Sequence, residues 1–361
     1  MISVHDHAGL NALARRCRVD PFLVRRFRTA FHKKQASAAD ALKELPAAAL
    51  ALFSREVDFH PLTLATRQDS QTDGATKLLF RTRSGELIES VILRIASGRT
   101  SLCVSTQAGC AAACAFCATG TLGLSRNLGA AEILDQVTQA NLLLQPEGRQ
   151  VRNLVFMGMG EPFHNEAELF RTLDLLAAPE GLHIDPRRML VSTVGIPDAM
   201  VRAAKRFPRL RLALSLHSAR PDVRERLIPV ARRHPLGALR EALLQVAALQ
   251  GELPMIEYLL LREVNDTDAD VLAVGEFLRG MKAHLNLIPY NAIHGPAPFD
   301  ATPPTRRAEF AAALRERGFT VTTRYSLGAD IAAACGQLAR VTAGQTPAPP
   351  QPRPAPISAA A

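Results

Sequence analysis

The sequence lacks several features that would place the protein outside the ordinary globular class. It contains no uninterrupted run of about 18 apolar residues, so we expect no membrane-spanning helix. Its first ten residues carry His and Asp where a secretory leader needs an apolar segment. Only six cysteines occur in 361 residues, and three of them are clustered, which argues against a disulfide framework. We therefore expect a cytoplasmic protein without membrane contact, and 47% hydrophobic residues suffice for a large buried core.

Acidic residues are scarce relative to basic ones. Lys and Arg together number 43 against 34 Asp and Glu, which gives a formal net charge of +9. This excess favours a polyanionic partner such as RNA, and a basic solvated surface is the alternative.

Residues 11–53 follow a helical pattern. Leu23, Phe27 and Phe31 form an apolar stripe, and the other faces carry basic residues that include Arg28. The sequence therefore predicts a helical accessory module over residues 1–60 that binds RNA, with a solvated basic face as the alternative. An Arg-rich segment at residues 202–233 is expected to extend the same basic surface.

From residue 100 onward, short β-rich runs alternate with helical patterns, which is typical of a parallel sheet wound with helices. The predicted strands are residues 101–105, 153–157, 189–193, 211–216, 255–261, 284–288 and 319–324. They indicate an α/β fold, a partial or complete β/α barrel over residues 100–342, with chemistry at the carboxyl ends of the strands. Residues 61–99 read as a β-hairpin extension around a Ser84-Gly85 turn. Residues 343–361, rich in Pro and Ala, are predicted to be a disordered tail.

Three cysteines, Cys110, Cys114 and Cys117, lie within eight residues after the first predicted strand. A structural zinc site uses four ligands, whereas an iron-sulfur cubane can be held by three thiolates with one iron left open for substrate. The CxxxCxxC spacing, with Phe116 before the last cysteine, favours the cubane. Three buried free thiols and a zinc site completed by Cys103 are the two alternatives.

Glycine and polar residues follow several other predicted strands. Gly158 and Gly160 allow a backbone to approach a ligand closely, and Glu161 beside them is well placed to hold an ammonium group. Polar side chains also end the third, fourth and sixth strands, at Ser192, Ser215, His217 and Asn291. Together they favour a binding site over isolated turn residues. On the residues alone, Glu89 in the hairpin is expected to be an exposed edge-strand glutamate, although apolar neighbours would raise its pKa.

The CxxxCxxC loop resembles that of the radical S-adenosylmethionine (SAM) enzymes, and MGMGEP at residues 157–162 looks like the segment with which they bind the methionine amine of SAM. RNL at 126–128, ACGQL at 334–338 and the position of Cys103 are similar to the RlmN/Cfr family. That family consists of radical SAM methyltransferases acting on an adenosine of 23S ribosomal RNA, adenosine 2503. The similarity covers about residues 62–340.

The resemblance implies a role for each motif. Cys110, Cys114 and Cys117 would ligate one 4Fe-4S cluster, and two SAM molecules would be used per turnover. Cys335 would accept a methyl group that is then converted to a carbon radical and added to the base. Cys103 would release the RNA through a transient disulfide, and Glu89 would accept a proton. The residues implied in SAM binding are Gly160, Glu161, Ser192, Ser215, Leu216, His217 and Asn291.

The resemblance also implies partners: 23S ribosomal RNA, tRNA as a further substrate, and a reducing electron donor such as flavodoxin, with the enzyme a monomer. One branch of the family methylates adenine C2, and the antibiotic-resistance branch methylates C8. Three segments look more like the resistance branch: residues 117–120, Ser218 and residues 289–291. Rival hypotheses are a radical SAM enzyme acting on tRNA or a peptide, with Cys335 incidental, and a zinc-stabilised RNA-binding module.

Overall fold

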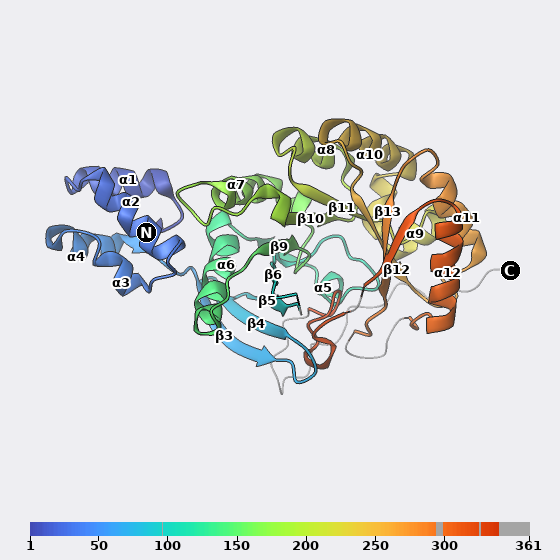
Figure 1. The fold of residues 1–361 in the computed structure, drawn as a ribbon, viewed down its shortest axis with the longest axis horizontal. Helices are drawn as coiled ribbons and strands as arrows, with labels where there is room; N and C mark the ends of the chain where they lie inside the picture. The colour runs from blue at the N-terminus through green and yellow to red at the C-terminus, as the bar shows by residue number, and fades with distance from the viewer. Residues whose placement is uncertain (96, 294–298, 325, 339–361) are drawn as a thin grey trace.

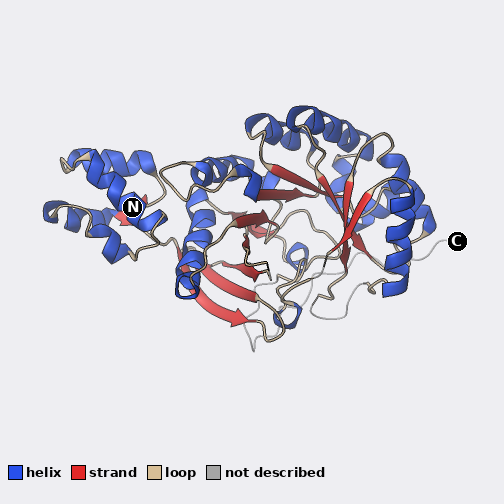
Figure 2. Cartoon of the chain, in the orientation of Figure 1, coloured by secondary structure: helices blue, strands red, loops and turns tan. Residues whose placement is uncertain are grey.

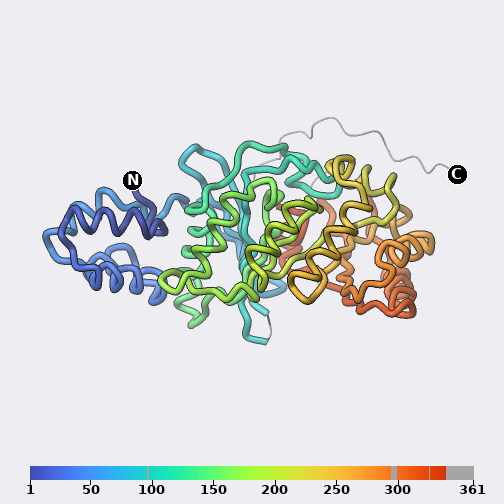
Figure 3. Tube along the Cα trace, turned by 90° about the horizontal axis from the view of Figure 1, so that it is seen from above, coloured from blue at the N-terminus to red at the C-terminus, as the bar shows by residue number. Residues whose placement is uncertain are grey.

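The computed structural model describes residues 1–95, 97–293, 299–324 and 326–338, which form a helical lobe and a body built on a wound sheet (Figure 1). The lobe holds α1 (His7–Arg16), α2 (Pro21–His32), α3 (Ala38–Leu42) and α4 (Ala47–Glu56). Two short parallel strands, β1 (Ile2–Ser3) and β2 (Val57–Asp58), join its ends. Its buried side chains form their own core, apart from that of the sheet. Seen from above, the lobe projects from one end of the molecule (Figure 3).

Helix α2 forms where the sequence predicts it. The Asp20 carboxylate accepts a hydrogen bond from the backbone N–H of Phe22 at 2.8 Å, and Pro21 occupies the first helical turn, where its missing N–H costs nothing. Phe27 and Phe31 are buried, which confirms the apolar stripe at these two positions.

The side of α2 that faces the body corrects one expectation. Arg28, expected on the exposed basic face, is buried and pairs with Glu180 at 2.8 Å. His60 likewise reaches the body, where its Nδ1 lies 2.7 Å from the carboxylate of Asp135. Arg28 is therefore part of the junction between lobe and body, and it does not belong to an exposed basic surface.

The body contains a ten-stranded sheet in the order β14-β13-β12-β11-β10-β9-β6-β5-β4-β3 (Figure 2). Seven of these strands pair in parallel: β6 (Thr100–Cys103), β9 (Asn153–Phe156), β10 (Met189–Thr193), β11 (Arg211–Ser215), β12 (Met255–Leu260), β13 (His284–Pro289) and β14 (Thr320–Thr323). All seven coincide with predicted strands. Because β14 and β3 are both edge strands, the barrel is partial.

The other three strands are antiparallel: β3 (Leu62–Asp69), β4 (Ala75–Thr82) and β5 (Leu87–Arg94). The β4–β5 hairpin turns at Ser84 and Gly85 as predicted, whereas no separate strand is predicted for the residues of β3. Since β5 also pairs with β6, the hairpin continues the main sheet and is not a detached extension. The proposed boundaries at residues 60, 99 and 342 remain predictions.

Helices cover the outer side of the sheet and leave its inner side to the loops (Figures 1 and 2). The longer ones are α6 (Ala130–Leu144), α7 (Glu166–Ala177), α8 (Pro197–Arg206), α10 (Leu236–Gln250), α11 (Asp268–Phe277) and α12 (Pro304–Glu316). Shorter elements near the strand ends are β7 (Gln107–Gly109), α5 (Ala118–Thr121), β8 (Leu124–Asn127) and α9 (Pro221–Leu227). Within the described residues no helix is long and apolar enough to cross a bilayer. The predicted tail at 343–361 lies outside the described residues.

Candidate active site

A cavity of about 930 Å³, including its open mouth, lies at the carboxyl ends of the parallel strands. Its walls contain nine of the residues predicted to be catalytic, to bind the cofactor or to ligate metal: Cys110, Cys114, Cys117, Gly160, Glu161, Ser192, Ser215, His217 and Cys335. Cys103, Glu89, Leu216 and Asn291 do not line the cavity and are placed behind or beside it.

The three-cysteine loop is held so that its thiols face one space. The backbone N–H of Cys117 donates to the carbonyl of Cys114 at 3.1 Å, and that of Cys110 donates to Gly123 at 2.9 Å. A side chain at Gly120 would come within 2.7 Å of the Cys114 carbonyl oxygen, so this position requires glycine. Burial raises the pKa of Cys110 to about 12 and raises those of Cys114 and Cys117. The free thiols are therefore protonated at neutral pH, and a bound metal is what would convert them to thiolates.

The MGMGEP segment is shaped by contacts with the rest of the chain. A side chain at Gly158 would approach the Val104 backbone to 2.6 Å, and one at Gly160, whose φ is +104°, would meet Gln107 at 2.6 Å. These glycines thus allow the β9 loop to pack closely on the β6–β7 segment. Their spacing is explained by packing, whatever ligand the loop also contacts.

Glu161 is buried and its carboxylate is committed to the chain. Oε1 accepts hydrogen bonds from Thr193 Oγ1 at 2.7 Å and Phe163 N at 3.1 Å, and Oε2 accepts one from Val194 N at 2.9 Å. Burial raises the pKa of Glu161 to about 7. The side chain therefore ties the end of β9 to the end of β10, and its expected contact with an ammonium group stays a prediction.

The polar residues at the next strand ends adopt distinct roles. Ser192 Oγ and Ser215 Oγ lie 3.2 Å apart in the cavity wall. His217 Nδ1 accepts a hydrogen bond from Leu259 N at 3.0 Å, and burial lowers the pKa of His217 to about 3. The ring is therefore neutral and carries its proton on Nε2. Leu216 is fully buried, and its backbone N–H and carbonyl are hydrogen-bonded within the chain, so its contact with SAM stays a prediction.

Cys335 is positioned by a segment that closes one side of the cavity. Asn291 Nδ2 donates to the Cys335 carbonyl at 3.3 Å, Ala118 N donates to Gly336 O at 2.7 Å, and Thr119 Oγ1 donates to Leu338 O at 2.7 Å. Asn291 therefore holds the Cys335 backbone, which is a positioning contact that the sequence did not predict.

Cys103 lies behind this wall, at the end of β6. Burial raises the pKa of its thiol to about 12, and the next largest influence on it is Cys335. The Arg324 guanidinium is close enough to act on both thiols, and Cys335 is the main reason why the pKa of Arg324 is raised. The six cysteines are all free. The zinc alternative needs Cys103 beside the three-cysteine loop, whereas the charged groups that act most strongly on the Cys103 thiol are Cys335 and Arg324.

Glu89 corrects the expectation of an exposed edge residue. It lies in β5, between β4 and β6, its side chain is 1% exposed, and Lys77 Nζ is 3.6 Å from its carboxylate. Val91 pairs with Cys103 across β5 and β6, so Glu89, two residues from Val91, shares a face of the sheet with Cys103. Its predicted role as a proton acceptor remains a prediction, and this diagonal arrangement is compatible with it.

Comparison with known proteins decides the family. The model of the Radical SAM superfamily matches residues 104–274. A crystal structure of a radical SAM methyltransferase from Sphaerobacter thermophilus has a TM-score of 0.90 and 37% identity, and the match covers 94% of this chain and 100% of that one. A probable RNA methyltransferase of Rhodopirellula baltica is 49% identical over 92% of this chain and 86% of its own length. A dual-specificity RNA methyltransferase RlmN of Anaeromyxobacter sp. is 40% identical, with 92% and 89% covered.

The chain belongs to the RlmN-type radical SAM RNA methyltransferases. This confirms the resemblance inferred from the motifs, and with it the partial barrel and the enzyme class. The family implies a 4Fe-4S cluster and SAM as cofactors and RNA as substrate.

The residues present fit an RlmN-type cofactor site. Three thiols line the cavity and would hold an iron-sulfur cluster there, which would supply the electron for cleaving SAM. Arg224, which is 1% exposed, lies near Cys114 and donates to the carbonyls of Ser215, Leu216 and Val194. Its buried charge favours an anionic cluster at this place. Among the described residues, no three His, Cys, Asp or Glu side chains are grouped closely enough to hold a single metal ion.

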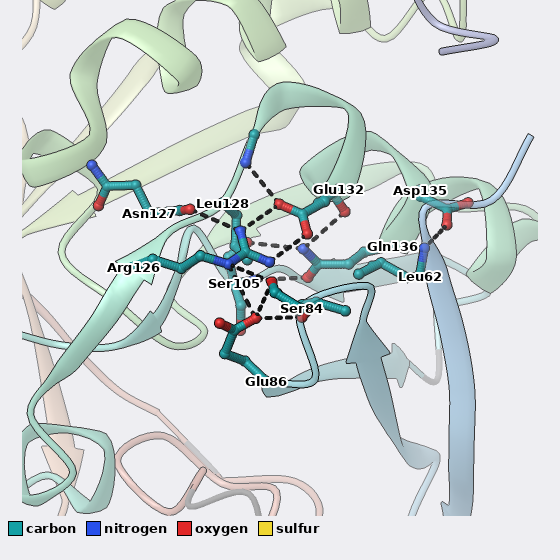
Figure 4. Close-up of polar contacts among 12 residues, drawn as sticks. Leu62, Ser84, Glu86, Ser105, Arg126, Asn127, Leu128, Glu132, Asp135 and Gln136 are labelled. Carbon is teal, nitrogen blue, oxygen red and sulfur yellow. Dashed lines mark hydrogen bonds and ion pairs between the residues drawn. The ribbon is translucent and has the colours of Figure 1, made fainter. Parts of the chain in front are cut away.

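A polar network behind the cavity fixes the RlmN-type RNL motif (Figure 4). Arg126 donates to both carboxylate oxygens of Glu132, at 2.7 and 2.8 Å, and to Glu86 at 3.1 Å. Hydrogen bonds from the Ser84 and Thr82 hydroxyls, with Arg126 adding to them, lower the pKa of Glu86 to about 2. Arg126 therefore ties β8 to the hairpin and to α6.

The sequence did not point to two charged residues that line the cavity, Glu257 and Arg324, or to a third, Arg224, that is buried near the three-cysteine loop. Arg224 was counted with the basic surface at 202–233, but it is buried beneath the three-cysteine loop. Glu257 and Arg324 line the cavity, on β12 and just after β14. A glutamate inside an otherwise apolar strand was an available signal for Glu257, whereas nothing local distinguishes Arg324 from a surface arginine.

Proposed function

We propose that this chain methylates a ring carbon of an adenine in 23S ribosomal RNA, at adenosine 2503, and that Cys335 carries the methyl group. The observation that supports this most directly is the place of Cys335. It shares one cavity with Cys110, Cys114 and Cys117, and it has Cys103 and Arg324 beside it. A methyl-carrying thiol needs to be near both the cofactors and a second thiol, and this arrangement meets both requirements.

The proposed cofactors are one 4Fe-4S cluster on the three-cysteine loop and two SAM molecules per turnover. When bound, they supply the radical that activates a methyl group on sulfur. The chain contributes the walls that hold them: Glu161 and Thr193 fix the loop after β9, and neutral His217 offers an N–H donor.

The cysteines carry the covalent steps that we propose. The Cys335 thiolate attacks the methyl carbon of SAM, forms a thioether and releases S-adenosylhomocysteine. After the activated carbon has joined the base, the adduct returns one electron to the cofactor as the ring loses its proton, and the RNA is then attached to Cys335 through that carbon. The Cys103 thiolate then attacks the Cys335 sulfur and forms a disulfide, and the electron pair of the broken C–S bond takes up a proton to give the methyl group. A thiol reductant restores both cysteines, and Glu89 accepts the proton lost from the ring.

The RNA surface that we propose is narrower than the sequence suggested. Arg202, Arg206 and Arg209 each pair with an acid, at 2.6, 2.6 and 2.7 Å, which weakens the second Arg-rich segment as a phosphate site. Arg25 and Lys33 on the helical lobe are exposed, and no ion pair of theirs occurs among the described residues. We therefore propose the lobe as the main RNA-binding surface outside the cavity.

The test is mapping of methylated adenines in 23S ribosomal RNA from cells with and without the gene, by digestion and mass spectrometry. We expect one adenine to lose a methyl group when the gene is removed, and chromatographic comparison of the released nucleoside with 2-methyladenosine and 8-methyladenosine standards to distinguish C2 from C8. The sequence motifs favour methylation at C8, whereas the similar proteins are named RlmN. Both carbons are therefore candidates. Unchanged ribosomal RNA together with undermethylated tRNA would favour tRNA as the substrate. The name dual-specificity borne by several relatives makes tRNA the second RNA to analyse.

A further inference from the structure

Glu257 is a buried carboxylate in the cavity wall that is only half satisfied. Its Oε2 accepts a hydrogen bond from Asn286 Nδ2 at 2.8 Å, and Asn286 Oδ1 in turn accepts one from Thr322 Oγ1 at 3.1 Å. Its Oε1 has no hydrogen-bond partner among the described residues, although the side chain is 1% exposed. A buried acceptor left without a donor costs stability, so an oxygen fixed in this way points to a ligand.

The surroundings of Oε1 limit what this ligand can be. Arg324 is near enough to Glu257 to oppose the rise in its pKa that burial causes. The guanidinium would repel a second cation, such as an ammonium or sulfonium group, and it therefore favours a neutral N–H or O–H donor. Because Asn286 already occupies Oε2, a single donor fits better than a ribose diol, which would use both oxygens.

The walls next to Glu257 are apolar. Leu259 lies two residues further along β12 and on the same face, and Ile288 pairs with Leu259 from β13. Both side chains line the cavity with Glu257. A flat heterocycle carrying one amino group matches an acceptor beside two apolar side chains, because the ring is desolvated while its amine is bonded.

We propose that Glu257 is a specificity-determining residue whose Oε1 accepts a hydrogen bond from the exocyclic amino group of an adenine bound in the cavity. The inference rests on the proposed function, which brings two adenines to this cavity: that of the target nucleotide and that of SAM. Both present the same neutral N–H donor at position 6 of the ring. Methylation requires the target ring to be oriented, and one bond to this amine would distinguish adenine from hypoxanthine.

The isosteric substitution Glu257→Gln makes the inference testable, because Asn286 would keep the remaining oxygen and leave the new amide NH₂ facing the ligand. An acceptor thus becomes a donor. We would measure Kd and the methylation rate of the cluster-loaded enzyme for a 23S RNA fragment with adenosine, and for the same fragment with inosine, at the target position. SAM and its 6-keto analogue would be compared in the same way.

We expect the wild-type protein to favour the 6-amino form by about tenfold to a hundredfold, and Glu257→Gln to reduce or reverse this ratio by at least about tenfold. Any intrinsic difference in reactivity between the two bases cancels when the ratios of variant and wild type are compared. If the variant changes the adenosine-to-inosine ratio of the RNA fragment, the amine bound by Glu257 belongs to the target base. If it changes the ratio of SAM to its 6-keto analogue, the amine belongs to the cofactor. Replacing the target adenosine by 2′-deoxyadenosine should leave the effect of the variant intact, and its disappearance would assign Oε1 to the ribose and overturn the proposal.

Asp270→Asn is the matched control, since Asp270 is a buried carboxylate outside the cavity, paired with Arg220 at 2.9 Å. It should leave both ratios at the wild-type value. Glu257→Asp, which withdraws the acceptor by one methylene, serves as a second variant if Glu257→Gln does not fold, and it should lower the ratio without reversing it. Ratios within twofold of wild type in every folded Glu257 variant, for RNA and SAM alike, would refute the proposal. Absence of methylation by the wild-type enzyme would count against the proposed function, and the SAM binding arm would still decide the role of Glu257.

Discussion

His217 Nδ1 accepts a hydrogen bond from the backbone N–H of Leu259, which fixes the imidazole as a neutral donor in the cavity. Burial lowers the pKa of His217 to about 3, from a usual value near 6.5. In the unfolded chain the ring takes up a proton as pH falls below about 6.5, whereas the folded protein resists this until about pH 3. The stability contributed by neutral His217 is therefore present at pH 7 and is lost as pH falls through this window.

From this we predict that wild-type protein loses about 2 kcal/mol more unfolding free energy between pH 7 and pH 5 than His217→Asn does. Asparagine also tolerates the positive φ of this position, which is 54°. His183→Asn is the control, because His183 has the same φ of 54° and is exposed, and it should behave as wild type. Urea unfolding at several pH values gives the measurement, and parallel pH profiles for all three proteins would contradict it.

A second prediction concerns the three-cysteine loop. Replacing any one of Cys110, Cys114 and Cys117 by Ala should leave the anaerobically purified protein nearly colourless, with iron reduced from about four atoms per chain to well below one. Cys17→Ala, in the helical lobe, should keep full iron and colour. Iron and sulfide analysis with visible absorption spectra would test this. Stoichiometric zinc in a colourless wild-type protein would refute it.

The pair of cysteines behind the cavity gives a third prediction. If Cys103 resolves the adduct, Cys103→Ala isolated from cells should carry RNA bound to Cys335, because nothing else breaks the C–S bond. Cys335→Ala should carry no RNA and no methylated cysteine. Mass spectrometry of nuclease-treated, proteolysed protein detects both states. Full turnover by Cys103→Ala without an adduct would remove Cys103 from the mechanism.

The exposed cations of the lobe give a fourth prediction. The double change Arg25→Gln with Lys33→Gln should reduce the slope of log Kd against log salt concentration by about two, since each lost phosphate contact removes about one. Arg28→Gln removes one charge from the same helix, but that charge is buried and paired with Glu180. It should lower the thermal stability of the lobe and leave the slope unchanged. Fluorescence titrations with an RNA fragment at four salt concentrations would separate these effects.

The parts of the molecule that the sequence predicted are those encoded locally. The alternation of β-rich and helical runs predicts the seven parallel strands. The spacing of Cys110, Cys114 and Cys117 predicts that their three thiols face one common space. The errors concern charged residues whose burial depends on distant segments. Arg28 is covered because α2 meets the body, and Glu89 is enclosed because β5 pairs with β6 as well as β4. Glu257 was not predicted because its importance depends on the absence of a hydrogen bond to its Oε1 among the described residues, which only the three-dimensional structure shows.

The segment that carries Cys335 is anchored to residues from the first third of the chain. Gly328 N donates to Asp73 across 255 residues, Ser70 Oγ donates to Asp330 across 260, and Thr119 Oγ1 donates to Leu338 across 219. During synthesis the three-cysteine loop leaves the ribosome long before these partners exist. A nascent chain that already holds Cys110, Cys114 and Cys117 thus lacks Cys335 and has an incomplete cavity wall. The cavity is closed by the last part of the described chain to be made, and on the proposed mechanism a protein truncated before residue 335 would transfer no methyl group even with its three-cysteine loop intact.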